Sequence, residues 1–422
     1  MMRGMPTSSR NAASFVDRLM GVGSPGDFLN QLEPRFDAPS PRVPGASLTT
    51  EVAVRRRWQL LPHATAAKEV LWSGGNLDLY ASNIEYAIGT VEVPVAIAGP
   101  LRVNGCVAAG DYYVPLATTE AALVASYTRG CQLISESGGC STLILAEGVT
   151  RAPGFVFSNL REVGEFVSWV LTQREAFAQA AEATTHHGKL TDLRLTVEGN
   201  HVYLVLEFFT GDAAGQNMVT IATQAVCDLI VDTSPVKPQF HFVEANLSGD
   251  KKASAQSFQN VRGRKVAAEC RIPAEELAKR LHTSASAMEE YWRMSALGGV
   301  LSGTIGVQGH YANGLAALFL ATGQDVACVS EAAVGVTRFE RQPDDSLYAA
   351  VTLPNVIVGT VGGGTGLPSQ AACLEILGLK GTGKARALAE VSAALALAGE
   401  LSIIGALAAG HFTRAHKKLA RT

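Results

Sequence analysis

The chain has 422 residues, of which 47% are hydrophobic and 17% charged, and 42 are glycine. This composition is typical of a well-packed protein of two or three domains and excludes a disordered or fibrous chain. With 35 basic and 38 acidic residues the net charge is −3, so nucleic-acid binding is not predicted.

The cysteines and the apolar segments bear on where the protein works. The seven cysteines are scattered without a CxxC pair, so neither a metal site nor a disulfide framework is expected, and a reducing cytoplasm fits best. The most apolar run, residues 388–409, contains Glu390 and Glu400. It is therefore predicted to be a buried helix and not a membrane span. No secretory signal is recognised at the N-terminus.

The order of predicted elements indicates an α+β fold with an inserted domain. Residues 1–50 are expected to form a flexible, partly helical arm, and residues 411–422 a mobile basic flap. A large domain is predicted from residues 51–153 and 244–410. Residues 154–243 read strand, helix, strand, strand, helix, strand, which is the split βαβ, ferredoxin-like pattern.

Within the large domain, Gly99-Pro100 is predicted to be a turn between two strands, and residues 262–265 are predicted to be irregular. The central feature is expected to be a buried helix over residues 118–134, because residues 121–125 are all apolar. Glu120 lies where this helix would enter the core. Two interpretations stay open: a carboxylate stabilised by the helix dipole, or a proton donor whose pKa is raised by burial.

Of three glycine-rich segments, two could approach a ligand. Residues 211–218 join a strand to a helix, whose free N–H groups could bind a phosphate, although an ordinary turn would look similar. Residues 359–366 contain more consecutive glycines than a turn requires. Residues 378–385 nearly match a phosphate-binding loop. Ala385, however, lacks the hydroxyl that would hold Mg²⁺, so this segment is interpreted as a helix end and linker.

Several segments, in order along the chain, resemble the catalytic portion of 3-hydroxy-3-methylglutaryl-coenzyme A (HMG-CoA) reductases. They are Ile88–Pro100, Pro115–Glu120, Asp212–Met218, Asp250–Lys252, Gly323–Asp325, Gly359–Thr365 and Leu407–His411 with His416.

The resemblance implies an α+β fold: a large mixed domain around a buried central helix, with a ferredoxin-like cofactor-binding domain inserted in it. It also implies four catalytic roles. Glu120 would donate a proton to the carbonyl, and Lys251 would stabilise the oxyanion. Asp325 would hold Lys251 and couple to Glu120, and His416 would protonate the coenzyme A thiolate.

The resemblance further implies ligands and partners. The cofactor would be NADPH, with NADH as the alternative, and the substrate an acyl-CoA thioester, with a carrier-protein thioester as the alternative. A homodimer or higher oligomer is expected, with the active site between subunits and no membrane or nucleic-acid partner. The implied cofactor-binding residues are Thr185, His186, Asp212, Ala213, Gly215, Gln216, Asn217, Gly362 and Gly363. The implied substrate-binding positions are Ser126, Arg129, Val156, Glu244, Asn246, Lys252, Met294 and Asn313.

Three of these positions depart from the family pattern. Val156, Glu244 and Met294 stand where the family has Arg, Ser and Lys, which would make the pocket three charges more negative. A buried unpaired charge is costly, so a thioester without the usual carboxylate is expected as substrate. One alternative is a true HMG-CoA reductase that makes mevalonate and holds the carboxylate with Lys252 and Arg293. Another is an inactive CoA-binding paralogue, although retention of the four catalytic residue types argues against it.

Overall fold

The computed structural model describes residues 34, 40–61, 65–72 and 77–410. The chain divides into two compact units, one comprising residues 1–75 with 85–89 and the other residues 76–84 with 90–422. Most of the predicted N-terminal arm and all of the predicted flap, including His416, lie outside the described residues. The predicted domain boundaries stay a prediction.

The smaller unit is organised by one buried arginine. This unit contains α3 (Glu51–Trp58) and α4 (Thr65–Leu71). Arg57 of α3 is only 1% exposed. Its guanidinium donates to four backbone carbonyl oxygens, those of Pro44, Gly45, Leu48 and Ala87. These bonds satisfy the buried charge and connect residues 44–48 and 85–89 to the helix.

The larger unit is built on an 11-stranded sheet. Most of it follows the order β7-β4-β6-β3-β8-β11-β10-β9. Strand β1 pairs with β3 of this series, β2 pairs with β1, and β5 pairs with β6. The strands are β1 (Val95–Gly105), β2 (Ala109–Ala117), β3 (Cys140–Arg151), β4 (Gly154–Val156), β5 (Lys189–Glu198), β6 (His201–Phe209), β7 (Phe240–Phe242), β8 (Gly263–Ile272), β9 (Gly306–Val307), β10 (Gly335–Arg341) and β11 (Leu347–Val356).

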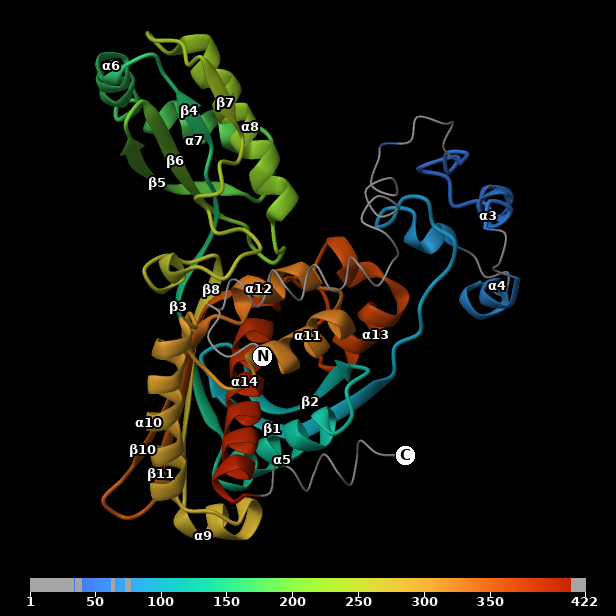
Figure 1. The fold of residues 1–422 in the computed structure, drawn as a ribbon, viewed down its shortest axis with the longest axis vertical. Coiled ribbons are helices and arrows are strands. Elements are labelled where there is room, and N and C mark those ends of the chain that lie inside the picture. Colours follow the sequence, from blue (N-terminus) through green and yellow to red (C-terminus); the bar gives the residue numbers. More distant parts are fainter. Residues whose placement is uncertain (1–33, 35–39, 62–64, 73–76, 411–422) are drawn as a thin grey trace, which may run out of the picture. The chain divides into compact units, whose positions relative to one another are not determined.

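Strand β3 joins two parts of this sheet. Residues 141–148 pair antiparallel with β8, and residues 149–151 pair antiparallel with β6. Beyond β6 lie β4, β7 and β5, all paired antiparallel. Three helices accompany these strands (Figure 1). They are α6 (Leu160–Val170), α7 (Arg174–Glu182) and α8 (Gln216–Thr233).

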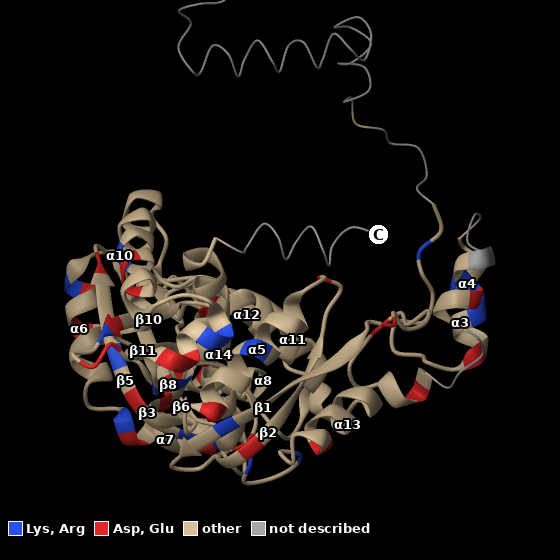
Figure 2. Ribbon diagram, turned by 90° about the horizontal axis from the view of Figure 1, so that it is seen from below, with Lys and Arg blue, Asp and Glu red and all other residues tan. Residues whose placement is uncertain are grey.

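The remaining helices surround the other end of the sheet. They are α5 (Leu123–Glu136), α9 (Ala274–Glu276), α10 (Ala285–Ser302), α11 (Tyr311–Thr322), α12 (Val329–Ala332), α13 (Pro368–Ile376) and α14 (Ala385–Ala408). Short helical turns lie at Leu77–Tyr80, Ala255–Phe258, Leu277–Leu281, Val326–Cys328 and Gly363–Gly366. In the view of Figure 2, acidic and basic residues of the large unit are interspersed.

The buried central helix is α14 and not the segment predicted. Nearly all of α14 is buried, between the sheet and helices α5, α10 and α11. It is the one described helix long and apolar enough to span a membrane, but 83% of its most apolar window is buried inside the protein. The prediction of a buried helix for residues 388–409 agrees with this packing.

Helix α5 differs from its prediction because small apolar residues do not reveal which side of a helix is buried. It begins at Leu123, and Ala121 and Ala125 are exposed. Its buried side chains instead recur at helical spacing, at Leu123, Tyr127, Cys131 and Ile134. Gly130 lets α5 approach α14, because a Cβ there would lie 1.9 Å from the carbonyl oxygen of Ala398.

Other local predictions were also wrong. Gly99-Pro100 lies inside β1, at an irregularity in its pairing with β2, where a strand tolerates proline. Residues 263–265 begin strand β8. The first of the two helices predicted within residues 154–243 is divided into α6 and α7.

Candidate functional site

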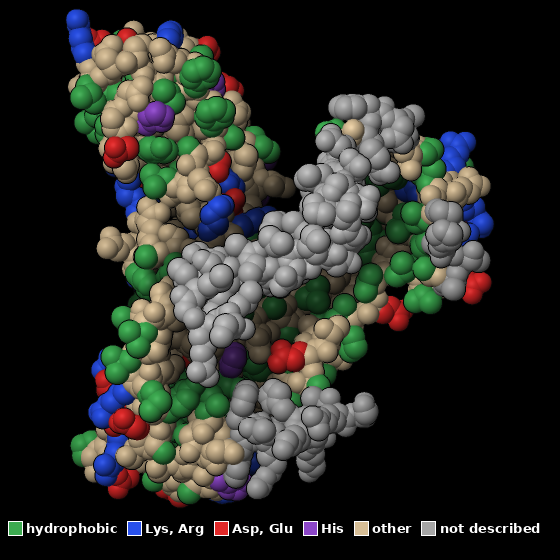
Figure 3. Space-filling model, viewed as in Figure 1, with side chains coloured by type: hydrophobic (Ala, Val, Ile, Leu, Met, Phe, Trp, Pro, Cys, Tyr) green, Lys and Arg blue, Asp and Glu red, His purple; other side chains and the backbone are tan. Residues whose placement is uncertain are grey.

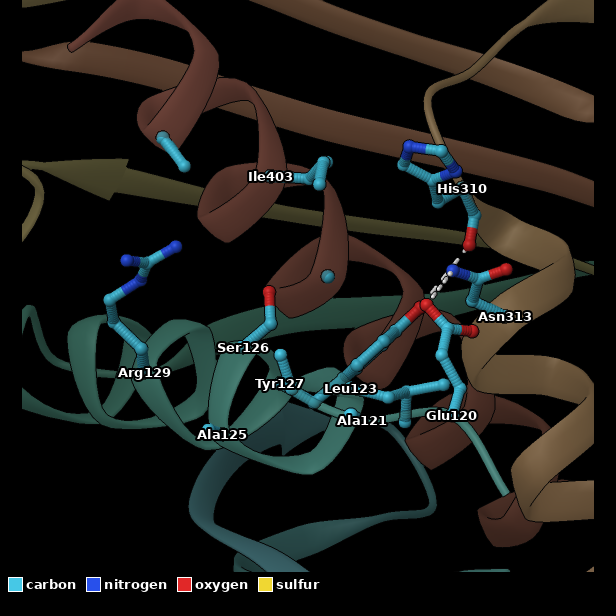
Figure 4. A pocket seen from close by; sticks show the side chains of 13 residues that line it. Glu120, Ala121, Leu123, Ala125, Ser126, Tyr127, Arg129, His310, Asn313 and Ile403 are labelled. Carbon is cyan, nitrogen blue, oxygen red and sulfur yellow. Dashed lines mark hydrogen bonds between the residues drawn. The ribbon is translucent and has the colours of Figure 1, made fainter. Parts of the chain in front are cut away.

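A cavity of about 140 Å³ lies beside α5, α11 and α14, with Glu120 at its edge (Figure 4). The Glu120 carboxylate accepts a hydrogen bond of 3.4 Å from the amide of Asn313, the third residue of α11. Glu120 is exposed in the single chain, so the interpretation that depends on burial, one of the two left open, is not supported within one chain. Its position three residues before α5 leaves it outside the packed part of the helix.

Two further predicted substrate residues line the same cavity. Ser126 and Arg129 lie on α5, and both contact Ser402 of α14. The Ser126 and Ser402 hydroxyl oxygens are 2.9 Å apart. The Arg129 guanidinium donates to the hydroxyl and carbonyl oxygens of Ser402, at 2.9 Å each from Nη2. Burial lowers the pKa of Arg129.

Glu400 fixes the wall of this cavity, a role that sequence reasoning missed. Its buried carboxylate accepts the backbone N–H groups of Gly309 and His310 at 2.7 and 2.8 Å, and the Thr337 hydroxyl at 2.6 Å. Burial raises the pKa of Glu400. Since residues 309–310 precede α11, this carboxylate helps to set the position of Asn313. A charged residue inside an otherwise apolar helix was the available signal.

Lys251 and Asp325 form an ion pair on the larger unit. The distance from Lys251 Nζ to Asp325 Oδ2 is 2.7 Å, and both side chains are a little over 40% exposed. The hydrogen bond to Asp325 raises the pKa of Lys251, so the amine is held as an ammonium. Lys251 has a positive φ of 54°, which is rare for a residue with a side chain.

Helix α11 separates this ion pair from Glu120. Glu120 contacts Asn313 near the start of the helix, and Asp325 follows its end. At 1.5 Å per residue, Asn313 lies roughly 14 Å along the helix axis from Thr322, the last residue of α11, and Asp325 follows three residues later. Among the described residues, no hydrogen bond or ion pair joins Glu120 to Lys251 or Asp325. The expected coupling between Glu120 and Asp325 is therefore not formed within one chain.

The positions that motivated an altered substrate are not an unpaired negative cluster. Glu244 accepts from the Arg151 guanidinium at 3.5 Å and from the backbone N–H groups of Ala152 and Asn246 at 3.2 and 2.7 Å. Its charge is thus compensated within the chain, which sequence alone could not show.

The other two positions belong to different elements. Val156 belongs to β4, where it pairs with His201 and Phe240. Met294 is 67% exposed on α10. The neighbouring Arg293 pairs with Glu289 and Glu290 on the same helix. Lys252 is exposed, and its ammonium donates to the Asp250 carbonyl oxygen at 2.8 Å.

Three sequence motifs converge at the start of α8. The backbone N–H of Thr360 donates to the carbonyl oxygen of Asp212 at 2.9 Å. The Gln324 side-chain oxygen accepts the backbone N–H of Gly359 at 2.8 Å, and its amide nitrogen donates to the Gly359 carbonyl oxygen at 3.0 Å. A Cβ on Gly359 would lie 2.6 Å from the Ala214 nitrogen, so this close approach requires glycine.

The residues at this convergence fit a dinucleotide pyrophosphate. Helix α8 begins after Gly215, which has φ 79° and offers no side-chain cap, so the N–H groups of the first turn can face an anion. Asn217 lies in that turn, and Ala213 lies in the loop before it. Gly362 and Gly363 have positive φ, with open space where a Cβ would be. Ligand and backbone could approach closely there.

Asp212, which is predicted to bind the cofactor, also has a structural contact. Its carboxylate accepts the backbone N–H groups of Gly383 and Ala385, at 2.7 and 3.2 Å, at the start of α14. It therefore caps that helix. Residues 378–385 form the predicted linker, since they connect α13 to α14.

The Thr185-His186 pair lies near the same end of α8. The Thr185 hydroxyl donates to the Met218 sulfur at 3.1 Å and accepts the N–H groups of His187 and Gly188. Met218 is in the first turn of α8, so this loop adjoins the uncapped N-terminus. Within the part of the chain that the structure describes, no cluster of potential metal ligands is found.

Comparison with known proteins places this geometry in context. The family model for hydroxymethylglutaryl-coenzyme A reductase matches residues 53–421. The chain belongs to this family. The predicted resemblance and α+β fold are thereby confirmed.

Curated relatives and solved structures agree with the family. A 3-hydroxy-3-methylglutaryl-coenzyme A reductase of Haloferax volcanii is 41% identical over 97% of this chain and 100% of its own length. The reductase of Methanothermobacter thermautotrophicus is 41% identical over 87% of this chain and 94% of its own. A class II reductase from Streptococcus pneumoniae, bound to NADPH, matches 84% of this chain and 96% of its own with a TM-score of 0.65. Its 19% identity supports the fold alone.

These relatives overturn the expected departure in substrate. The prediction of a non-HMG acyl group was wrong, because curated proteins at 41–43% identity over most of the chain are named HMG-CoA reductases. The physical premise fails as well, since Glu244 is paired with Arg151 and Val156 belongs to a strand pairing.

Proposed function

We propose that this chain reduces HMG-CoA to mevalonate and free coenzyme A. The observation that carries the proposal is the 41% identity to the Haloferax reductase, which extends over 97% of this chain. The Lys251–Asp325 ion pair supports it, because reduction of a thioester places negative charge on oxygen at each hydride transfer.

The proposed roles follow from where charge develops. The Lys251 ammonium, held by Asp325, stabilises the oxyanion of the thioester and later of the aldehyde. Glu120 donates the proton that the alcohol oxygen requires. His416 protonates the departing thiolate. Lys252 and Arg293 hold the free carboxylate of the substrate.

NADPH is the proposed cofactor, and it supplies the hydrides when bound. The first turn of α8, with Gly362 and Gly363, binds the pyrophosphate, and Thr185 and His186 contact the 2′-phosphate. The NADPH-bound structural relative supports this choice. His186 is a weaker phosphate ligand than arginine at neutral pH, so NADH is the alternative to compare.

A second copy of the chain is proposed to complete the active site. Glu120 and the Lys251–Asp325 pair lie at opposite ends of α11 in one chain, so Glu120 of one subunit would serve the ion pair of another. Exposed apolar side chains on α10 are consistent with an oligomer. They are Met294, Leu297, Val300 and Leu301. Figure 3 shows apolar side chains on this face over α10. A cytoplasmic location stays a prediction.

The test is a direct assay of the purified chain with HMG-CoA and NADPH. Mevalonate is measured by mass spectrometry and NADPH by absorbance, and two NADPH should be consumed for each mevalonate formed. Lys251→Ala is the control, and loss of such a charged stabiliser is expected to lower kcat by roughly 10²–10³-fold. A wild-type chain that binds NADPH but forms no mevalonate would refute the proposal.

A further inference from the structure

A chain of buried charges connects the proposed cofactor loop to Lys251. Its charged members are Arg151, Asp250, Arg262 and Glu331, and the two arginines hydrogen-bond to the neutral Gln216. The Arg262 side chain is 3% exposed and that of Glu331 is 0% exposed. Burial on this scale is costly unless every charge is paired, so such a cluster restricts how its members can move.

Arg262 is the centre of this network. Its Nε donates to Glu331 Oε2 at 2.7 Å, and its Nη1 donates to the Thr150 carbonyl oxygen at 2.6 Å. Its Nη2 donates to Gln216 Oε1 at 3.0 Å and to the Asp250 carboxylate. A planar guanidinium with donors in fixed directions holds these groups in one arrangement.

Two hydrogen bonds connect this network to Asp250 and Lys251. The other oxygen of Glu331 accepts the backbone N–H of Lys251 at 3.3 Å. Asp250, the residue before Lys251, is held from its other side by Arg151 at 2.8 Å. The positive φ of Lys251 is a strained conformation, and strain of this kind persists only where the surroundings enforce it.

The same two arginines, Arg151 and Arg262, also hold the start of α8, where the cofactor is proposed to bind. Arg151 Nη2 donates to the Gln216 carbonyl oxygen at 3.3 Å, while Arg262 binds the Gln216 side chain. Gln216 is the first residue of α8, at the proposed pyrophosphate site. The amide of Gln216 also donates to Cys328, which lies beside α12 and Glu331.

We propose that Glu331 and Arg262 are positioning residues that couple occupancy of the cofactor loop to the conformation of Lys251. Cofactor binding at the start of α8 restrains Gln216, and the network passes that restraint to the backbone of Lys251. The ammonium is then placed for oxyanion stabilisation when the hydride donor is present. This inference rests on the proposed function.

The kinetic test compares Glu331→Gln with Glu390→Gln. Glutamine keeps the size of Glu331 but removes the charge that faces Arg262. Glu390 is an equally buried carboxylate that accepts the backbone N–H groups of Val107 and Ala108, outside the network. Displacement of a catalytic group by about 1 Å can cost on the order of 10²-fold in rate.

For Glu331→Gln, we therefore expect kcat to fall about 10- to 100-fold while KM for each substrate changes less than about three-fold. Glu390→Gln should keep the kcat of the wild type, even if its melting temperature falls as much as that of Glu331→Gln. Equal kcat values for the two variants would overturn the positioning role.

A second measurement needs no acyl substrate. Hydrogen exchange of the peptide that covers Ser248–Lys252 is followed with and without saturating NADPH. We expect NADPH to slow exchange at Lys251 in the wild type and to have no such effect in Arg262→Lys, which keeps the charge but loses the directed bonds. Unchanged wild-type exchange with NADPH bound would refute the coupling.

The two measurements separate this inference from the proposed function. A chain that binds NADPH and shows the exchange effect but does not reduce HMG-CoA would refute the function and support the coupling. A chain that reduces HMG-CoA but shows no exchange effect would support the function and refute the coupling.

Discussion

At the scale of single residues, the ionisation of Lys251 depends on Asp325. The hydrogen bond to Asp325 raises the pKa of Lys251, so the ammonium persists to higher pH than it would alone. Oxyanion stabilisation needs the protonated form, so activity should fall when pH rises above this pKa.

Asp325→Asn should therefore move the alkaline limb of the kcat–pH profile to lower pH, besides lowering kcat. The measurement is a pH series of initial rates with saturating HMG-CoA and NADPH. An alkaline limb that stays in place would show that Lys251 ionisation does not control the rate.

Lys252 gives a second prediction at this scale. It is exposed beside the ion pair and is proposed to hold the substrate carboxylate. Lys252→Ala should raise KM for HMG-CoA about ten-fold, since one exposed charge-assisted contact is worth on the order of 1 kcal/mol. It should leave kcat/KM for a carboxylate-free acyl-CoA unchanged. Lys265→Ala, at a lysine that donates to the Phe258 carbonyl oxygen, serves as a control. Equal losses on both substrates would refute the assignment.

At the scale of elements, the crossing of α5 and α14 depends on Gly130. A Cβ at this position would meet the Ala398 carbonyl group, which is backbone and cannot rotate away. Gly130→Ala should lower the free energy of unfolding by at least about 1–3 kcal/mol.

The matched control is Gly164→Ala in α6, where an added Cβ meets nothing within 4 Å. Alanine there should stabilise the protein by roughly 0.5–1 kcal/mol. Chemical denaturation of both variants measures the difference. A Gly130→Ala variant as stable as Gly164→Ala would contradict the close helix contact.

At the scale of the whole molecule, the separation of Glu120 from Lys251 predicts a site shared between subunits. Glu120→Gln and Lys251→Ala homodimers should each be nearly inactive. After subunit exchange, half of the dimers are mixed, and each mixed dimer contains one intact site. The mixture should recover about a quarter of wild-type activity.

This recovery is measured after co-expression of the two variants with different tags, which also establishes the fraction of mixed dimers. The negative control is a chain that carries both Glu120→Gln and Lys251→Ala, co-expressed with two tags in the same way. Failure to recover activity in proven mixed dimers would place Glu120 and Lys251 of one chain in the same site.

The sequence alone determined the order of secondary structure and the family. Regular alternation and helical spacing depend on neighbours along the chain, so the order of strands and helices from β4 to β7 could be read directly, although the break between α6 and α7 could not. The family resemblance carried by the Asp250–Lys252 and Gly323–Asp325 motifs implied the Lys251–Asp325 pair before any contact was known.

Only the tertiary structure decided which groups are buried and which charges are paired. Burial was one of two interpretations of Glu120, which is exposed in the single chain, whereas Glu331, Glu390 and Glu400 are buried. Glu244 was counted as an unpaired anion, but Arg151, 93 residues earlier in the chain, neutralises it. Burial and electrostatic energy depend on distances between atoms that the fold brings together from remote positions, and these distances have no signature in the local sequence.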